Sequence, residues 1–307
     1  MKKDFNQLNN YIPGQASVCI FFVMSGFFLH LSTFKEFAFK KTIGIFVPTL
    51  LCVLLSAFIQ FLFGNLNISV LDFFMNILML PMASNLFVYV DGAHWYIAFL
   101  LLYFIYFVLI KLFVKIIKKD IAEHILLIIL SILSFSTTFL PTSLVIFKIL
   151  RVLLNPHFLL INLGIFIRKI SNDNIYSRTN KLFAFIVGIL FVMSLVTVYR
   201  TYGILQFVYY LILFAAMILC MFRKICFLEK TIFQFIGNAS LFVYLIHQEV
   251  GFLMLNTFNN IGLYLPGVVI TFVTMMVIGI FLHYLYNTFV VELINKLAHS
   301  LKKEKTI

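Results

Sequence analysis

Long apolar stretches separated by short clusters of lysine and arginine make up most of this sequence. Nine stretches are long enough to cross a bilayer as helices. They lie at 16–34, 43–63, 95–117, 121–140, 152–168, 181–199, 204–222, 233–255 and 267–289. Each is continuous and lacks the alternation of a membrane β-strand, so its backbone must satisfy its own hydrogen bonds within a helix. The sequence therefore predicts an all-α, polytopic helix bundle in a membrane.

The scarcity of charge supports a lipid environment. Only 11% of the 307 residues are charged and 63% are hydrophobic, whereas a water-soluble domain carries about 25% charged residues. The net charge of +12 does not indicate a nucleic-acid partner, because the basic residues cluster between apolar stretches, as in cytoplasmic loops.

The four cysteines lack the spacing of zinc ligands. We expect them to be packing residues, with no metal site and no bound cofactor.

The distribution of lysine and arginine also predicts orientation. If the loop with Lys35, Lys40 and Lys41 is cytoplasmic, alternation along the chain places most of the 23 Lys and Arg residues on that side. The N-terminus then lies outside and the C-terminus inside. The predicted single domain, 1–307, comprises three parts: a polar outer segment at 1–15, membrane helices at 16–289 and a cytoplasmic tail at 290–307. We expect a multi-pass protein of the cell membrane.

One apolar segment, 68–86, is interrupted by Asp72, Asn76 and Pro81. We expect a helix that lies in the membrane interface or dips into the bundle.

The stretch at 233–255 has the most informative polar pattern. Four residues at intervals of three and four share one face of the expected helix: Gly237, Ser240, Tyr244 and His247. Glu249 follows near the outer mouth. A histidine beside a carboxylate suits general-base chemistry on a hydroxyl, because its ordinary pKa is near neutral. A histidine that only hydrogen-bonds a neighbouring helix is an equal alternative.

Further polar residues gather near the predicted outer face. His94 and Trp95 open the stretch at 95–117, and Asp91 could pair with His94. For Trp95, the only tryptophan, an interfacial anchor is the favoured interpretation from sequence physics alone. At the inner face, Lys40 and Lys41 are either topology determinants or ligands for phosphate groups.

The segment CIFFVMSGFFL at 19–29 resembles the FFxxSGF signature of the acyltransferase 3 family of bacterial membrane acyltransferases. Similar matches follow in the order of the family: FKKTIGIFVP at 39–48, HWYIAFLLLY at 94–103, the weaker NPHFLLINLGIFI at 155–167 and IGNASLFVYLIH at 236–247. Together these matches extend over nearly the whole chain.

The resemblance implies ten spans and transfer of an acyl group, often acetyl, from cytoplasmic acyl-CoA to a glycan or lipid-linked sugar outside. The polar pattern and the resemblance together predict the site. His247, Glu249 and His94 are the expected catalytic residues, and the expected donor-binding residues are Ser25, Gly26, Lys40, Lys41 and Trp95. Lysines replace one arginine pair of the family and provide no bidentate fork for phosphate. The first span of the family, with its histidine, has no counterpart, so we expect that this chain lacks it.

Two other functions remain open at this point. A transporter or flippase for a polysaccharide or lipid-linked sugar would usually have repeated halves and paired broken helices. The sequence has one broken segment and no repeat, which argues against transport. An inactive acyltransferase remnant, without the first helix of the family, is the third possibility.

Overall fold

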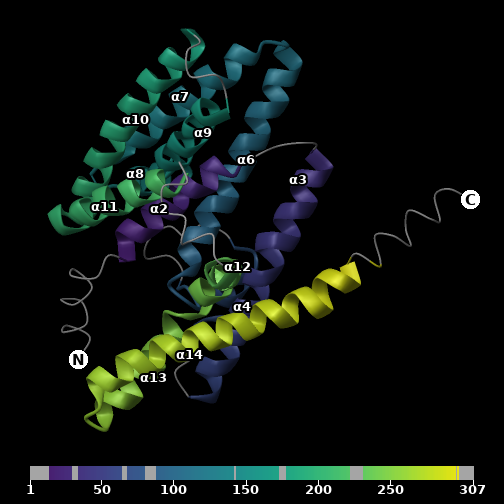
Figure 1. Ribbon diagram of the computed structural model, residues 1–307, viewed down its shortest axis with the longest axis vertical. Helices are drawn as coiled ribbons and strands as arrows, with labels where there is room; N and C mark the ends of the chain where they lie inside the picture. The colour runs from purple at the N-terminus through teal and green to yellow at the C-terminus, as the bar shows by residue number, and fades with distance from the viewer. Residues whose placement is uncertain are drawn as a thin grey trace, which may run out of the picture. The chain divides into compact units, whose positions relative to one another are not determined.

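The computed structural model describes residues 14–29, 34–63, 68–79, 88–141, 143–172, 178–221, 231–294 and 296. Every regular element in these ranges is a helix (Figure 1), which confirms the all-α class there. The chain forms two compact units, one within 1–32 and 99–225 and the other within 33–98 and 226–307. Helix α6 (His94–Ile117) contributes to both. The single domain expected from the sequence stays a prediction.

Five helical stretches in the described part of the chain are long and apolar enough to cross a membrane: Glu36–Leu62, His94–Ile117, Val145–Ser171, Lys181–Tyr202 and Tyr264–Ile294. A bent helix pair would make a sixth, and three apolar helices are shorter. Each of the nine apolar stretches found in the sequence coincides with one of these helices or helix pairs. The number of crossings and their direction stay predictions.

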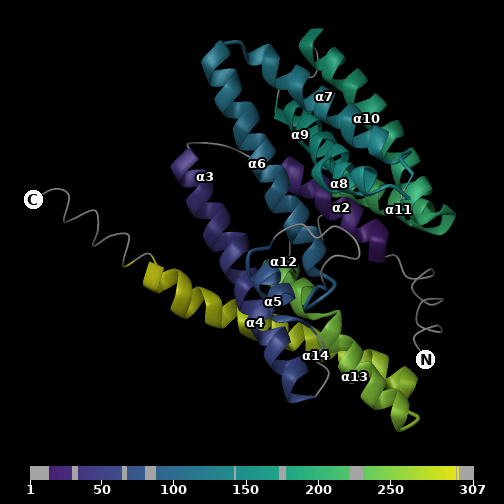
Figure 2. The ribbon, with the colours of Figure 1, turned by 180° about the vertical axis from the view of Figure 1, so that it is seen from behind.

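The first unit is built around a close crossing of two helices. It contains α2 (Gly14–Phe27), part of α6, α7 (Asp120–Thr137), α8 (Val145–Leu153), α9 (Phe158–Asn172), α10 (Arg178–Tyr202) and α11 (Ile204–Met221). Helix α9 packs against α2, α7 and α10 (Figure 2). A Cβ atom at Gly26 would lie 1.8 Å from the carbonyl oxygen of Ile161, and one at Gly164 would lie 1.9 Å from that of Val23. Glycine at both positions therefore lets the backbones of α2 and α9 touch.

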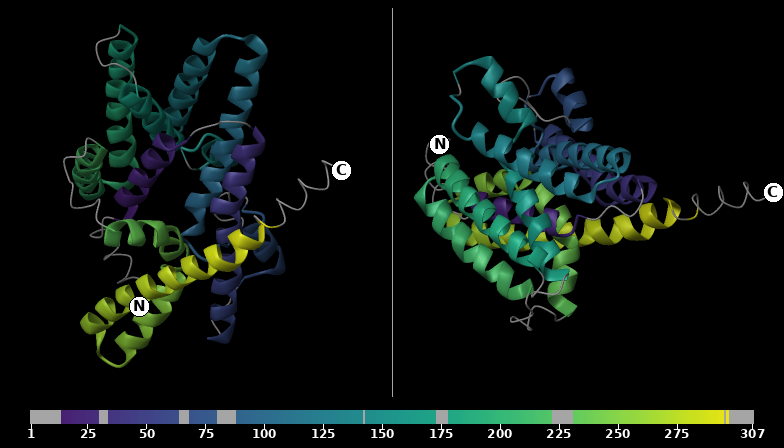
Figure 3. Two further views of the ribbon diagram at one scale, coloured as in Figure 1. Left: turned by 45° about the vertical axis from the view of Figure 1, so that its right-hand side comes forward. Right: turned by 90° about the horizontal axis from the view of Figure 1, so that it is seen from above.

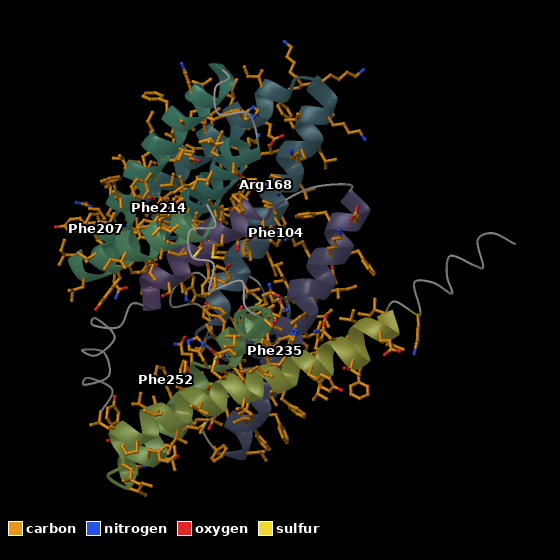
Figure 4. The ribbon with its side chains drawn as sticks, in the orientation of Figure 1. Phe104, Arg168, Phe207, Phe214, Phe235 and Phe252 are labelled. Carbon is orange, nitrogen blue, oxygen red and sulfur yellow. The ribbon has the colours of Figure 1, made fainter. Side chains whose placement is uncertain are left out.

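Side chains in this unit project from every helix. Phe207 and Phe214 lie on α11, Phe104 on α6 and Arg168 on α9 (Figure 4). The guanidinium of Arg168 donates to the carbonyl oxygen of Leu29, 3.3 Å away, and so satisfies a backbone acceptor just beyond the end of α2. Residues 1–13 of the expected polar segment lie outside the described residues. The expected absence of a first helix therefore stays a prediction. Gly14 and Gln15 begin α2.

The stretch at 152–168 lies within the candidate span Val145–Ser171 and contains a turn between two helices. Helix α8 ends at Leu153 and α9 begins at Phe158. Pro156 lies in the turn between them and has no N–H to continue a helix. The side chain of Asn155 accepts the N–H of His157 at 2.9 Å, which stabilises the turn.

The second unit contains α3 (Phe34–Lys41), η1 (Thr42–Phe46), α4 (Val47–Leu62), α5 (Val70–Ile77), the start of α6, α12 (Thr231–Ile246), α13 (Glu249–Asn260), α14 (Tyr264–Leu285) and η3 (Tyr286–Val291). Helix α14 packs along α12 and α13, and α4 packs against α12, α13 and α5 (Figure 3). Residues 292–294 continue the helix beyond η3, past residue 289, where the last membrane helix was expected to end.

A widened, π-helical turn follows the lysine pair of α3. This turn is η1, and Pro48 comes shortly after it. Proline cannot donate to the carbonyl four residues earlier and crowds that carbonyl, so a regular α-helical turn is disfavoured there. Within this turn, the carbonyl of Ile43 accepts the hydroxyl of Tyr286 from η3. The two widened turns are thereby linked.

The expected interfacial helix at 68–86 is shorter in the structure. Helix α5 ends at Ile77, and Met79 adopts a positive φ of 49° that departs from the helix. Residues 80–86 lie outside the described residues.

Candidate active site

The site lies at a break between α12 and α13. The sequence predicted one continuous helix at 233–255, and the structure instead has two: α12 ends at Ile246, α13 begins at Glu249 and the two are bent by 73°. Phe235 and Phe252 label the helices on either side of the bend in Figure 4. Two residues, His247 and Gln248, form the break.

Side chains from the start of α6 and from the segment just before it replace a backbone hydrogen bond at this bend. In an uninterrupted helix the N–H of Glu249 would donate to the carbonyl of Leu245. Instead it donates to Oδ2 of Asp91 at 3.2 Å, and the carbonyl of Leu245 accepts from Nε2 of His94 at 3.1 Å. Both groups freed by the break are therefore satisfied, which is a physical reason for the bend.

The last turn of α12 is held in the same way. The hydroxyl of Tyr244 donates to the carbonyl of Ala93 at 2.8 Å. Nδ1 of His247 donates to the carbonyl of Tyr244 at 2.6 Å, and the rings of Tyr244 and His247 lie 5.5 Å apart. The residues before α6 and the end of α12 therefore form one polar assembly.

These contacts assign opposite tautomers to the two histidines. A carbonyl oxygen can only accept, so in each neutral ring the contacting nitrogen carries the proton. Nδ1 of His247 is protonated, and its Nε2 presents a lone pair from an exposed side chain. Nε2 of His94 is protonated, and its Nδ1 is a buried acceptor without a hydrogen-bond partner among the described residues.

Asp91 stabilises the assembly from inside. Its side chain is fully buried; Oδ1 accepts the N–H of Ala93 at 2.8 Å, and Oδ2 accepts that of Glu249. Burial raises the pKa of Asp91 to about 7, against the lowering effect of these two bonds. The sequence suggested that Asp91 pairs with the His94 side chain. The structure corrects this, because the carboxylate caps the N-terminus of α13 instead.

Sequence reasoning missed Gly92 and Gln248 at this site. A Cβ atom at Gly92 would lie 2.3 Å from Nε2 of Gln248, so glycine allows the loop to approach the bend closely. The available signal was the Asp91–Gly92 pair directly before the helix. Glu249 and Trp95 are both half-buried, and their catalytic and donor-binding roles stay predictions.

The other expected donor-binding residues lie elsewhere. Nζ of Lys40 is 2.5 Å from the carboxylate of Glu36, and its side chain is 70% exposed. Lys41 lies with Nζ 5.7 Å from the ring centre of Phe37. These lysines belong to the second unit, together with the bend.

Ser25 and Gly26 belong to the first unit. Ser25 is half-buried, and Gly26 touches the backbone of α9. Their donor-binding role stays a prediction.

Two other polar residues of the first unit have structural partners. Nδ1 of His157 lies 2.6 Å from Oδ1 of Asn155, and its Nε2 lies 2.8 Å from the hydroxyl of Tyr202. Arg151 donates to the carbonyls of Thr137 and Leu140. Both therefore serve the fold of this unit.

Within the described ranges, no three His, Cys, Asp or Glu side chains gather to form a metal site, and the three cysteines described there are free thiols.

The apolar helices and the histidine-lined bend define a helical membrane protein with a site suited to proton transfer. A family model described as an acyltransferase domain matches residues 3–285. The chain thus belongs to the acyltransferase 3 family, as the motifs predicted, and this membership suggests a membrane acyltransferase activity. No curated protein and no solved structure matches the chain.

Proposed function

We propose that this protein transfers an acyl group, acetyl in the first instance, from cytoplasmic acyl-CoA to a hydroxyl of an extracytoplasmic polysaccharide or lipid-linked sugar. It would act in the inner or plasma membrane as a multi-pass enzyme. Family membership favours acyl transfer over transport.

The observation that carries this proposal is the hydrogen bond from Nδ1 of His247 to the carbonyl of Tyr244. It fixes the ring and leaves the lone pair of Nε2 available on an exposed side chain. A fixed imidazole with a free lone pair is the form that removes a proton from a hydroxyl. Glu249, two residues further on, would favour the imidazolium that forms.

His94 supports the same chemistry through its buried Nδ1. A buried acceptor without a partner is uncommon and costs about 1–3 kcal/mol. A hydroxyl of the bound acceptor would satisfy it and so position the sugar beside the bend. The two histidines would then divide the work: His247 takes the proton and His94 orients the acceptor.

In the reaction, the acceptor hydroxyl oxygen forms a bond to the carbonyl carbon of the thioester, and the carbon–sulfur bond breaks. The hydroxyl proton passes to Nε2 of His247 and then to the departing thiolate of coenzyme A. Lys40 and Lys41 would hold the phosphates of the donor. The exposed ion pair of Lys40 with Glu36 is weak, so a phosphate can replace the carboxylate.

Transfer of label in membranes tests the proposal. Membranes containing the intact protein are given acetyl-CoA labelled in the acetyl group, and label in the surface glycan is measured. His247→Asn keeps an N–H near the Nδ1 position for the carbonyl of Tyr244 but removes the base. We expect it to lower the rate by about two to four orders of magnitude. The matched control is His283→Asn, in α14 of the same unit, which should leave the rate unchanged.

Two results would contradict the proposal. One is the absence of label in the glycan with the intact protein. The other is an undiminished rate in His247→Asn, which would make His247 a packing residue.

A further inference from the structure

The short segment that precedes the site, residues 88–91, is held by side chains instead of by secondary structure. The N–H of Val88 donates to Oδ1 of Asp72 at 3.0 Å, and its carbonyl accepts from Nδ2 of Asn76 at 2.8 Å. The N–H of Val90 donates to Oδ1 of Asn76 at 2.9 Å, and its carbonyl accepts from Nε2 of Gln60 at 2.6 Å. Alternate residues thus bond like a β-strand whose neighbour consists of side chains.

Helix α5 keeps the two bonding side chains in place. Ser69 and Asp72 form a capping box at its N-terminus, where Oδ2 of Asp72 accepts the N–H and the hydroxyl of Ser69. Oδ1 of Asp72 is thereby directed to Val88. Nδ2 of Asn76 also donates to the carbonyl of Asp72 at 2.7 Å, which fixes the amide.

The polarity of α5 is inverted relative to a helix in water. Asp72 and Asn76 are buried, at 9% and 3% exposure, whereas its outward residues are large and apolar: Val70, Leu71 and Phe74. An apolar face suits lipid, and the polar face is reserved for the 88–91 segment. Solvation of a surface helix therefore does not explain these two polar residues.

The held segment leads directly into the site. Asp91, which caps α13, follows Val90, and the N–H of His94 donates to the carbonyl of Asp91 at 3.0 Å. A shift of the 88–91 segment would move both residues.

We propose that Asp72 and Asn76, here called the α5 clamp, are positioning residues that set the location of Asp91 and His94. The catalytic part of this inference rests on the proposed function. The clamp acts through the 88–91 backbone and does not touch the substrate.

Asn76→Asp tests the clamp, because it keeps the size of the side chain and removes both donated hydrogen bonds. The matched control is Phe74→Ala on the outward face of the same helix. In purified full-length protein, diethyl pyrocarbonate modification of each histidine is measured by mass spectrometry. We expect the buried His94 to be protected at least about tenfold relative to the exposed His247. Asn76→Asp should remove this protection, and Phe74→Ala should retain it.

Kinetics and hydrogen exchange complete the test. Misplacement of a site group by about 1 Å lowers turnover roughly 100-fold, so kcat of Asn76→Asp should fall by about 10- to 100-fold with the KM for acetyl-CoA unchanged. Amide exchange should rise at 88–93 and stay unchanged in α14. Asp72→Asn weakens the hydrogen bond to Val88 and should shift each measurement in the same direction. It replaces Asn76→Asp in the test if that variant does not fold.

Several outcomes would overturn the clamp: continued protection of His94 in both variants, a raised KM with unchanged kcat, or faster exchange throughout the unit including α14. If the intact protein transfers no label, the proposed function fails. The protection of His94 then decides the clamp by itself.

Discussion

Nε2 of His94 donates to the carbonyl of Leu245, 3.1 Å away, and so completes a hydrogen bond that the bent helix has lost. The same ring directs Nδ1 into the interior, where the described residues provide no donor. In His94, Nε2 therefore supports the fold and Nδ1 has no protein partner among the described residues. Substitutions can separate the roles of these two nitrogens.

His94→Gln places an amide N–H near the Nε2 position and should keep the bond to Leu245. His94→Asn places its amide near the Nδ1 position and should lose that bond. If Nδ1 orients the acceptor, we expect His94→Gln to remain as stable as the intact protein, with turnover lowered at least about tenfold. Thermal unfolding and acetyl transfer measure the two effects. Full activity of His94→Gln would show that only the structural nitrogen matters.

Replacing Lys40 and Lys41 together with glutamine should raise the apparent KM for acetyl-CoA by about tenfold or more. Each lysine that contacts a phosphate contributes a charge-assisted hydrogen bond. Acceptor affinity should not change. The matched control is Lys296→Gln, because Lys296 forms a similar exposed ion pair with Glu292. An increase in the KM for the acceptor alone would show that the two lysines do not bind the donor.

The stability of the protein should depend on the protonation of Asp91. Its pKa of about 7 lies above the ordinary value of 3.8, so the protonated carboxyl favours the folded state. This contribution is complete below about pH 4, is lost as the pH rises to about 7 and is constant above that. The difference between the two pKa values corresponds to a change in the free energy of unfolding on the order of 4 kcal/mol. Thermal unfolding between pH 4 and 8 should show this decline in stability for the intact protein. The decline should be absent in Asp91→Asn. Parallel curves for the two proteins would contradict the assignment.

Gly26→Ala should destabilise the first unit. The new methyl group would meet the carbonyl oxygen of Ile161 at 1.8 Å, and a backbone atom cannot move aside without separating α2 from α9. Overpacking of this kind costs about 1–3 kcal/mol or more. Gly188→Ala is the control, because no heavy atom lies within 4 Å of its added Cβ. Thermal unfolding in detergent measures both. A stable Gly26→Ala variant with weakened donor affinity would instead favour the donor-binding role.

The basic residues predict that the turn between α6 and α7 is cytoplasmic. Lys118 is exposed in this turn. In a variant with Cys220 and Cys226 replaced by serine, a cysteine introduced at Lys118 should resist an impermeant thiol reagent in intact cells. A cysteine introduced at Asn67, predicted to be outside, should react. Reaction at position 118 in intact cells would refute the orientation.

The sequence predicted the features that depend on local composition. Apolar stretches identify membrane helices because the transfer of each side chain into lipid is nearly independent of its sequence neighbours. All nine stretches therefore coincide with helices or helix pairs. The motifs at 19–29, 39–48, 94–103 and 236–247 likewise identified the family, which the match over residues 3–285 confirmed.

The tertiary structure decided how the site is assembled. Apolarity alone predicted an unbroken helix at 233–255, because the hydrogen bonds that stabilise the bend come from distant residues. His94 and Leu245 are 151 positions apart, and Asp91 and Glu249 are 158 apart. The sequence therefore identified His94 and His247 as candidates, but it could not indicate which nitrogen of each ring is available. That depends on which carbonyl the folded chain brings into contact with each imidazole.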